Sequence, residues 1–193
     1  MESFNDKLSR ILAERIEVVD YDPVWPALFE AECARLAVHF PAGSIRRVEH
    51  VGSTAVPGLA AKPIIDILVG VDDLGFVVEL VAPAMEEAGY DYFFRPELGD
   101  EGPRYPWFIG RNAFGARVSH IHVALIDDAS QWDRVVFRDY LRGHVDAQRE
   151  YAQLKRDLAS RYPDDREAYT RAKTVFITEA VTRARAEGLT GTT

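Results

Sequence analysis

Near Asp128 the apolar residues of this chain change from short β-branched runs to stripes at helical spacing. The earlier runs, such as those at 44–51 and 62–71, predict strands. The later stripes predict three successive helices. We therefore expect one α+β domain over residues 1–193, with a mixed β-sheet in a sheet-rich core at about 18–128, flanking helices, and a C-terminal helical bundle at about 129–187.

Several local signals give this pattern more detail. Asp22 and Pro23 predict the start of a helix that continues to about residue 40. The run at 74–90 predicts a crossover helix whose second half begins at Pro83. The segments at 104–111 and 116–126 predict a hairpin joined by the sequence "NAFG". Within the bundle, Pro163 ends one helix, and Asp164 or Asp165 caps the next.

The charge balance limits the classes of partner. The chain carries 31 acidic and 23 basic residues, for a net charge of -8, which argues against general nucleic-acid binding and against binding to anionic membranes. Any phosphate site must then be a local basic pocket. The first twenty residues mix charges and do not resemble a signal peptide, and no segment approaches the roughly 20 apolar residues of a membrane span. We expect a cytoplasmic protein, and the single cysteine, Cys33, fits a reducing compartment.

A Gly-Ser-Thr turn separates the first two predicted strands. Gly52 permits a tight turn with close backbone approach, and Ser53 and Thr54 offer hydroxyl and amide groups that suit phosphate oxygens. The turn is not a Walker loop, because position 57 is proline and Lys62 comes too late. The alternative is an ordinary turn with a Ser/Thr cap, and the turn by itself favours this alternative, because glycine and serine are common turn residues.

Asp66 is a single carboxylate inside the second apolar strand. It shares its face with Ile64 and Leu68, so burying it is costly unless it is paired or bound to a cation. We therefore expect Asp66 to lie at a ligand cleft.

Two histidines lie in a later strand pattern, at positions that share a sheet face. His120 and His122 are two residues apart, so their side chains point the same way. Together with Asp66, and with His50 or Glu49 as a further candidate ligand, they predict a site that favours zinc, manganese or iron over magnesium. The alternative is that they are hydrogen-bonded cleft residues that hold no metal.

Several basic residues are candidates for a phosphate funnel in this acidic chain. Each of them alone is explained by a cationic side chain that covers apolar surface. Facing the turn as a set, they would bind phosphate oxygens. The candidates are Lys62, Arg138, Arg142, Lys155 and Lys173.

Four blocks together resemble the GrpB family. The blocks are "YDPVWPALFEAE", "EHVGSTAVPGLAAKPIIDILVGV", "SHIHVAL" and "FRDYLRGHVDAQREYAQLKRDLA", and the resemblance runs from about Val18 to about Ala180. It implies similarity to the nucleotidyltransferase fold and to a domain fused to dephospho-CoA kinase in some bacteria. In that superfamily the Gly-Ser turn binds nucleotide phosphates, and the next strand carries two carboxylates at alternate positions. Here Leu68 stands two residues after Asp66, so the carboxylate pair is reduced to one.

Three functions remain open from the sequence. The first is a nucleotidyltransferase-like protein that binds a nucleotide or CoA-like phosphate ligand and transfers a nucleotidyl group to a small acceptor. The second is a non-catalytic nucleotide-binding module. The third is a metal-dependent hydrolase that uses Asp66, His120 and His122. The resemblance implies a divalent metal such as magnesium, and the two histidines add zinc and manganese as candidates. Leu68 favours the second and third functions over the first.

Overall fold

A computed structural model of the chain describes residues 4–94 and 104–191. Its centre is a five-stranded sheet in the order β1-β2-β5-β4-β3. The strands are β1 (Arg47–Val51), β2 (Ile65–Val71), β3 (Asp91–Phe94), β4 (Pro106–Arg111) and β5 (Arg117–Leu125). β2 and β5 are parallel and the other neighbours are antiparallel, so the sheet is mixed, as predicted.

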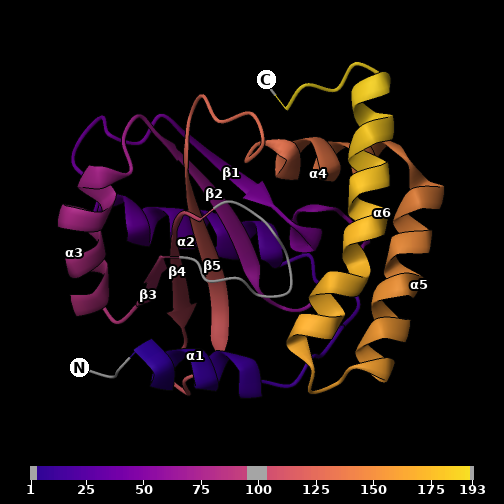
Figure 1. The fold of residues 1–193 in the computed structure, drawn as a ribbon, viewed down its shortest axis with the longest axis horizontal. Coiled ribbons are helices and arrows are strands. Elements are labelled where there is room, and N and C mark those ends of the chain that lie inside the picture. The colour runs from indigo at the N-terminus through magenta and orange to yellow at the C-terminus, as the bar shows by residue number, and fades with distance from the viewer. Residues whose placement is uncertain (1–3, 95–103, 192–193) are drawn as a thin grey trace.

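Helices cover both faces of this sheet (Figure 1). They are α1 (Phe4–Ala13), α2 (Trp25–Ala37), α3 (Ala82–Glu87), α4 (Asp133–Gly143), α5 (Val145–Arg161) and α6 (Arg166–Ala186). A short 3₁₀ turn, Ser53–Ala55, follows β1, and a π-helical turn, Val77–Val81, leads into α3. The helices α4, α5 and α6 form the predicted C-terminal bundle, so the α+β architecture with flanking helices is confirmed.

The two faces of the central strands have different surroundings. Ile67 of β2 and Ile121 of β5 belong to the main core with α2 and α3. The next residue, Leu68, belongs to a separate cluster with Trp132 at the start of α4. Because side chains alternate along a strand, Asp66 shares the face of Leu68, the face covered by the C-terminal helices.

Three of the expected helix boundaries have clear local causes. Pro83 lies in the first turn of α3, as predicted. Asp165 caps α6, because its side chain accepts a hydrogen bond from the Ala168 amide at 2.9 Å. The prediction for α2 is corrected: Asp22 accepts from the Val24 amide, and the helix begins at Trp25 with Pro26 in its first turn.

Two elements, α1 and β3, had no sequence prediction. β3 is a four-residue edge strand beside β4, and α1 packs against this end of the sheet. Ion pairs connect both elements to β4: Arg111 of β4 pairs with Asp91 of β3 and with Glu14 just after α1, each at 2.8 Å. Among the described residues, none of the helices combines the length and apolar character that crossing a bilayer requires.

Candidate functional site

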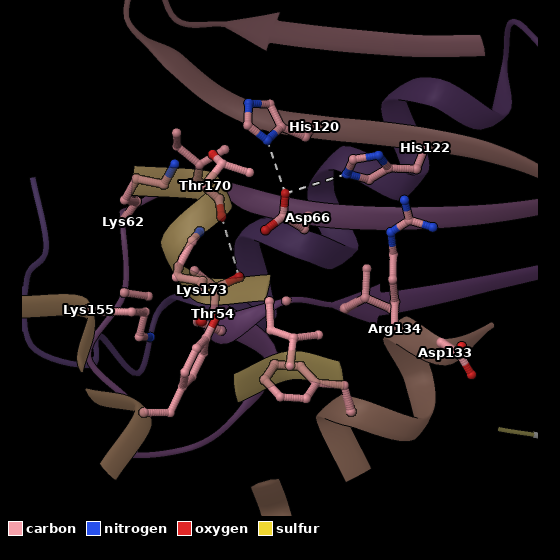
Figure 2. A pocket seen from close by; sticks show the side chains of 18 of the residues that line it. Thr54, Lys62, Asp66, His120, His122, Asp133, Arg134, Lys155, Thr170 and Lys173 are labelled. Carbon is pink, nitrogen blue, oxygen red and sulfur yellow. Dashed lines mark hydrogen bonds and ion pairs between the residues drawn. The ribbon is translucent and has the colours of Figure 1, made fainter. Parts of the chain in front are cut away.

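A cavity of about 450 Å³ lies between the Asp66 face of the sheet and the C-terminal helices (Figure 2). Its walls come from the turn after β1, from β2 and β5, and from α4, α5 and α6. Segments from both halves of the chain therefore enclose it. Most of the site residues expected from the sequence lie on its walls: Gly52, Ser53, Thr54, Lys62, Asp66, His120, His122, Lys155 and Lys173.

Gly52 and Asp66 are in direct contact. Gly52 has a φ of 70° and a ψ of -171°, a conformation that side-chain-bearing residues rarely adopt. A Cβ at this position would overlap the Asp66 Oδ2 oxygen and lie 3.1 Å from the Asp66 Cβ. Glycine is therefore required here both by the backbone and by the carboxylate beside it.

Asp66 and the two histidines form one cluster (Figure 2). The Oδ1 oxygen of Asp66 accepts a hydrogen bond from His120 Nδ1 at 3.0 Å and lies 3.6 Å from His122 Nε2. Burial raises the pKa of Asp66, but the hydrogen bonds of the two histidines outweigh it and hold that pKa well below its usual range. Burial lowers the pKa of His120 to about 3, so this imidazole is neutral and the carboxylate is charged.

A second layer of hydrogen bonds positions His122. Its Nδ1 lies 2.8 Å from the Tyr105 hydroxyl, and that hydroxyl accepts a hydrogen bond from Arg134 of α4 at 2.9 Å. With its proton on Nδ1, His122 donates to the Tyr105 hydroxyl, and the lone pair of Nε2 then faces Asp66 and is free to bind a metal. The ring of His122 is thereby fixed by Tyr105.

The cluster has the composition of a metal site. Ligand atoms of Asp66, His120 and His122 all lie within 4.8 Å of one another. Two imidazole nitrogens and one carboxylate oxygen suit zinc, manganese or iron, whereas magnesium prefers oxygen ligands. The residues therefore fit a divalent transition metal.

The two additional candidate ligands lie away from the cluster. His50 points to the opposite face of the sheet, where it stacks on Phe29 with ring centroids 4.7 Å apart. The reason is the register, because the neighbouring Val51 is the residue of β1 that pairs with Asp66. Glu49 accepts hydrogen bonds from Arg47 at 2.8 Å and from Arg138 at 2.6 Å, so its charge is already compensated.

One hydroxyl group of the turn is already hydrogen-bonded within the protein. The Thr54 hydroxyl lies 3.0 Å from His50 Nε2 and is also within 3.4 Å of the Ile64 carbonyl oxygen. Ser53 and Thr54 both line the cavity, but the hydroxyl of Thr54 is held by the protein, so the Ser53 side chain and the backbone of the turn provide the polar groups there.

Lysines are concentrated at this cavity. The chain has four lysines, and Lys62, Lys155 and Lys173 all line it. In the view of Figure 2 these three gather on one side of Asp66, and Arg134 lies on the other. The cavity walls are thus strongly cationic in a protein whose net charge is -8.

Lys155 is the most deeply buried of the three. Its side-chain ammonium donates to the Ala60 carbonyl oxygen and lies 4.8 Å from the centre of the Tyr151 ring. Burial, together with the charge of Lys173, lowers the pKa of Lys155 to about 7. A ligand with negative charge in the cavity would favour the protonated, positively charged form of Lys155.

Arg138 and Arg142 are not brought to the cavity. Arg138 is buried under β1, where it bonds Glu49, Asp139 and the His50 carbonyl oxygen. Arg142 donates from two nitrogens to the Ala55 carbonyl oxygen, at 3.0 and 2.7 Å. The helical spacing placed both on one side of α4, but that side faces the outside of the turn and the edge of the sheet, where both bind protein oxygens.

The cavity also contains polar residues that the sequence did not point to. Tyr105 and Arg134 support His122, and Arg166 and Tyr169 stand at the start of α6. Arg166 directly follows the capping residue Asp165, a sequence signal of a helix start and nothing more. Its approach to Asp66 depends on how α6 packs on the sheet, so only the tertiary structure reveals it.

Comparison with known proteins places the chain among bacterial relatives. A UPF0157 protein of Pseudomonas aeruginosa is 46% identical over 176 residues, which cover 90% of this chain and 69% of that protein. Glutamate-rich protein GrpB of Alkalihalophilus pseudofirmus is 31% identical, covering 84% of this chain and 91% of that protein. A dephospho-CoA kinase of Mycolicibacterium paratuberculosis is 31% identical over 88% of this chain but only 46% of its own length.

The fold and the family model agree with these similarities. The crystal structure of conserved protein GrpB from Enterococcus faecalis matches with a TM-score of 0.76 and 34% identity, covering 89% of this chain and 98% of that one. The family model described as GrpB protein matches residues 15–183. On this evidence the chain belongs to the GrpB family.

Proposed function

We propose that the cavity binds a small phosphate-containing ligand, a nucleotide or a CoA-like ester, next to a divalent metal held by Asp66, His120 and His122. The observation that carries the proposal is the placement of three of the four lysines on the wall of one cavity in an acidic chain. A random surface distribution would not place them together. Phosphate is the common biological anion that such a cluster of cations binds.

Nucleotidyl transfer is the activity most consistent with this arrangement. The lysines would hold the phosphate chain, and Gly52 would let the backbone of the turn approach it. A bound metal ion would polarise a phosphoryl oxygen and balance the charge that develops on it. The hydrogen bond between His122 Nδ1 and the Tyr105 hydroxyl would keep the ring of His122 in place for this task.

Two alternative functions follow from Leu68, which stands where a second carboxylate would be expected on β2. The nitrogen-rich ligand set also suits a metal-dependent hydrolase that acts on a phosphate ester. A module that binds a nucleotide without reaction would need the lysines but not the metal. Incubation of the protein with nucleoside triphosphate, manganese and small hydroxyl acceptors, followed by phosphorus NMR, separates the three through the products: a nucleotidylated acceptor, a hydrolysed nucleotide, or unchanged nucleotide.

Thermal unfolding with and without ligands tests the binding itself. ATP, ADP and dephospho-CoA should raise the melting temperature in a concentration-dependent way, while adenosine and pantetheine should not. The double variant Lys62→Met/Lys173→Met should lose this stabilisation. Lys7→Met is the matched control, because Lys7 is the remaining lysine and pairs with Glu86 away from the cavity. An equal response of both variants to ATP would refute the assignment of the lysines.

A further inference from the structure

Arg166 is a buried cation at the wall of the cavity. Its side chain lines the cavity at the first residue of α6, and the residue is 8% exposed. In the part of the chain that the structure describes, its guanidinium forms no hydrogen bond and no ion pair. A buried guanidinium in a purely structural role is normally paired, because leaving the charge uncompensated is costly.

The nearby carboxylates are already engaged with other groups. Glu14 and Asp66 are the acidic residues whose charges attract Arg166. Glu14 bonds the side chains of Arg111 and Arg117, and Asp66 bonds His120. Burial, and next the positive charge of Arg117, lowers the pKa of Arg166 to about 10. The positive charge of Arg166 is therefore not fully compensated by these carboxylates, and an anion could compensate it.

Lys62 and Lys173 stand beside the same aromatic ring. Lys62 Nζ lies 5.4 Å from the centre of the Tyr169 ring and Lys173 Nζ lies 4.3 Å from it. Burial lowers the pKa of Lys62 well below its usual range, and the charges of Arg166 and Lys173 lower it further. Arg166 lies one helical turn before Tyr169 on α6, and all three cations line the cavity, so they lie in one region of its wall.

We infer that Arg166 and Lys62, with Lys173, form an anion subsite for a doubly charged phosphate group, such as the terminal phosphate of an ester or pyrophosphate. The inference rests on the proposed function and adds Arg166 as the residue that recognises the ligand's charge. A guanidinium can bond two phosphate oxygens at once, and two ammonium groups balance the remaining charge. A single carboxylate would leave this group of cations undercompensated.

The substitution Arg166→Met distinguishes a binding role from a structural one. Methionine is apolar and flexible, so removing an unpaired buried charge should leave the ligand-free protein as stable as the wild type or more stable. Calorimetric titration with pyrophosphate at constant ionic strength should show at least a tenfold loss of affinity in the same variant. Arg171→Met is the matched control: it removes a positive charge from an exposed position of α6 and should change neither quantity.

A set of ligands separates this inference from the proposed function. Pyrophosphate, inorganic phosphate, ADP and adenosine are titrated into wild-type protein, Arg166→Met and Arg166→Lys. Binding of ADP and pyrophosphate that weakens in Arg166→Met and partly recovers in Arg166→Lys supports the subsite. If ADP binds wild type and Arg166→Met equally well, the subsite is wrong and the proposed function stands. If no phosphate compound binds the wild type with or without manganese, both are overturned.

Discussion

Replacing Gly52 with alanine should destabilise the protein far more than a Gly→Ala change usually does. The backbone at Gly52 has a φ of 70° and a ψ of -171°, which costs a residue with a side chain about 1–3 kcal/mol. In addition, the new Cβ would overlap Asp66 Oδ2, so the carboxylate would have to turn away from His120. Losing a hydrogen bond to a charged group costs about 1.5–3 kcal/mol.

The two costs together are about 2.5–6 kcal/mol, and they can be separated by controls. For a chain of this length they correspond to a fall in melting temperature of about 10 °C. Gly43 also has a positive φ, 77°, but a Cβ there would meet nothing within 4 Å. Gly43→Ala should therefore cost only the backbone penalty, about 1–2 kcal/mol.

Urea unfolding of these variants gives the free energies of unfolding directly. The double variant Gly52→Ala/Asp66→Ala lacks the overlapping oxygen, so it should be more stable than the sum of the two single changes predicts, by about 1–2 kcal/mol. If Gly52→Ala is no less stable than Gly43→Ala, the close contact between the turn and Asp66 does not exist as described.

Three further predictions concern stability. Burial lowers the pKa of His120 to about 3 and of His50 to about 4, so below about pH 6.5 the unfolded chain takes up two protons that the folded chain does not. As the pH is lowered from about 6 to about 4, the free energy of unfolding should fall by up to about 2.7 kcal/mol per pH unit. In urea unfolding, His50→Gln should halve this dependence on pH. Because the pKa of Lys155 falls to about 7 on folding, stability should rise between pH 7 and about 10 by about 1.4 kcal/mol per unit; an equal rise in Lys155→Met would rule this out. Asp165→Ala should cost about 1 kcal/mol by removing the cap of α6, whereas Asp164→Ala should cost little, as thermal unfolding can show.

The centre of the site could be predicted from the sequence because strand geometry is regular. Side chains alternate along β5, so His120 and His122 had to share one sheet face, and Asp66 had to share the face of Leu68 on β2. Parallel pairing of β2 with β5 then brings Asp66 opposite His120. The histidine of β1 shows the limit of this reasoning, since the pairing register, which the sequence does not state, turns His50 to the other face.

Which residues form the other walls of the cavity depends on how the helices pack against the sheet. Arg138 and Lys155 both looked like cations on helical stripes, yet Arg138 bonds Glu49 at the edge of the sheet and Lys155 lines the cavity. Which one lines the cavity is decided by the rotation of α4 and α5 against the sheet. Arg166 carried no pattern of its own, because one basic residue at a helix start is common. The short strand β3 escaped prediction because four residues carry too little periodicity.

Crystals grown with manganese and ATP would show whether the cavity holds a metal ion and phosphate together. We predict an anomalous manganese peak at coordination distance, about 2.2 Å, from Asp66, His120 and His122. We also predict phosphate density between this peak and the side chains of Lys62 and Arg166. Phosphate and metal bound elsewhere on the protein, with the cavity holding only solvent at saturating ATP, would show that the proposed site is wrong.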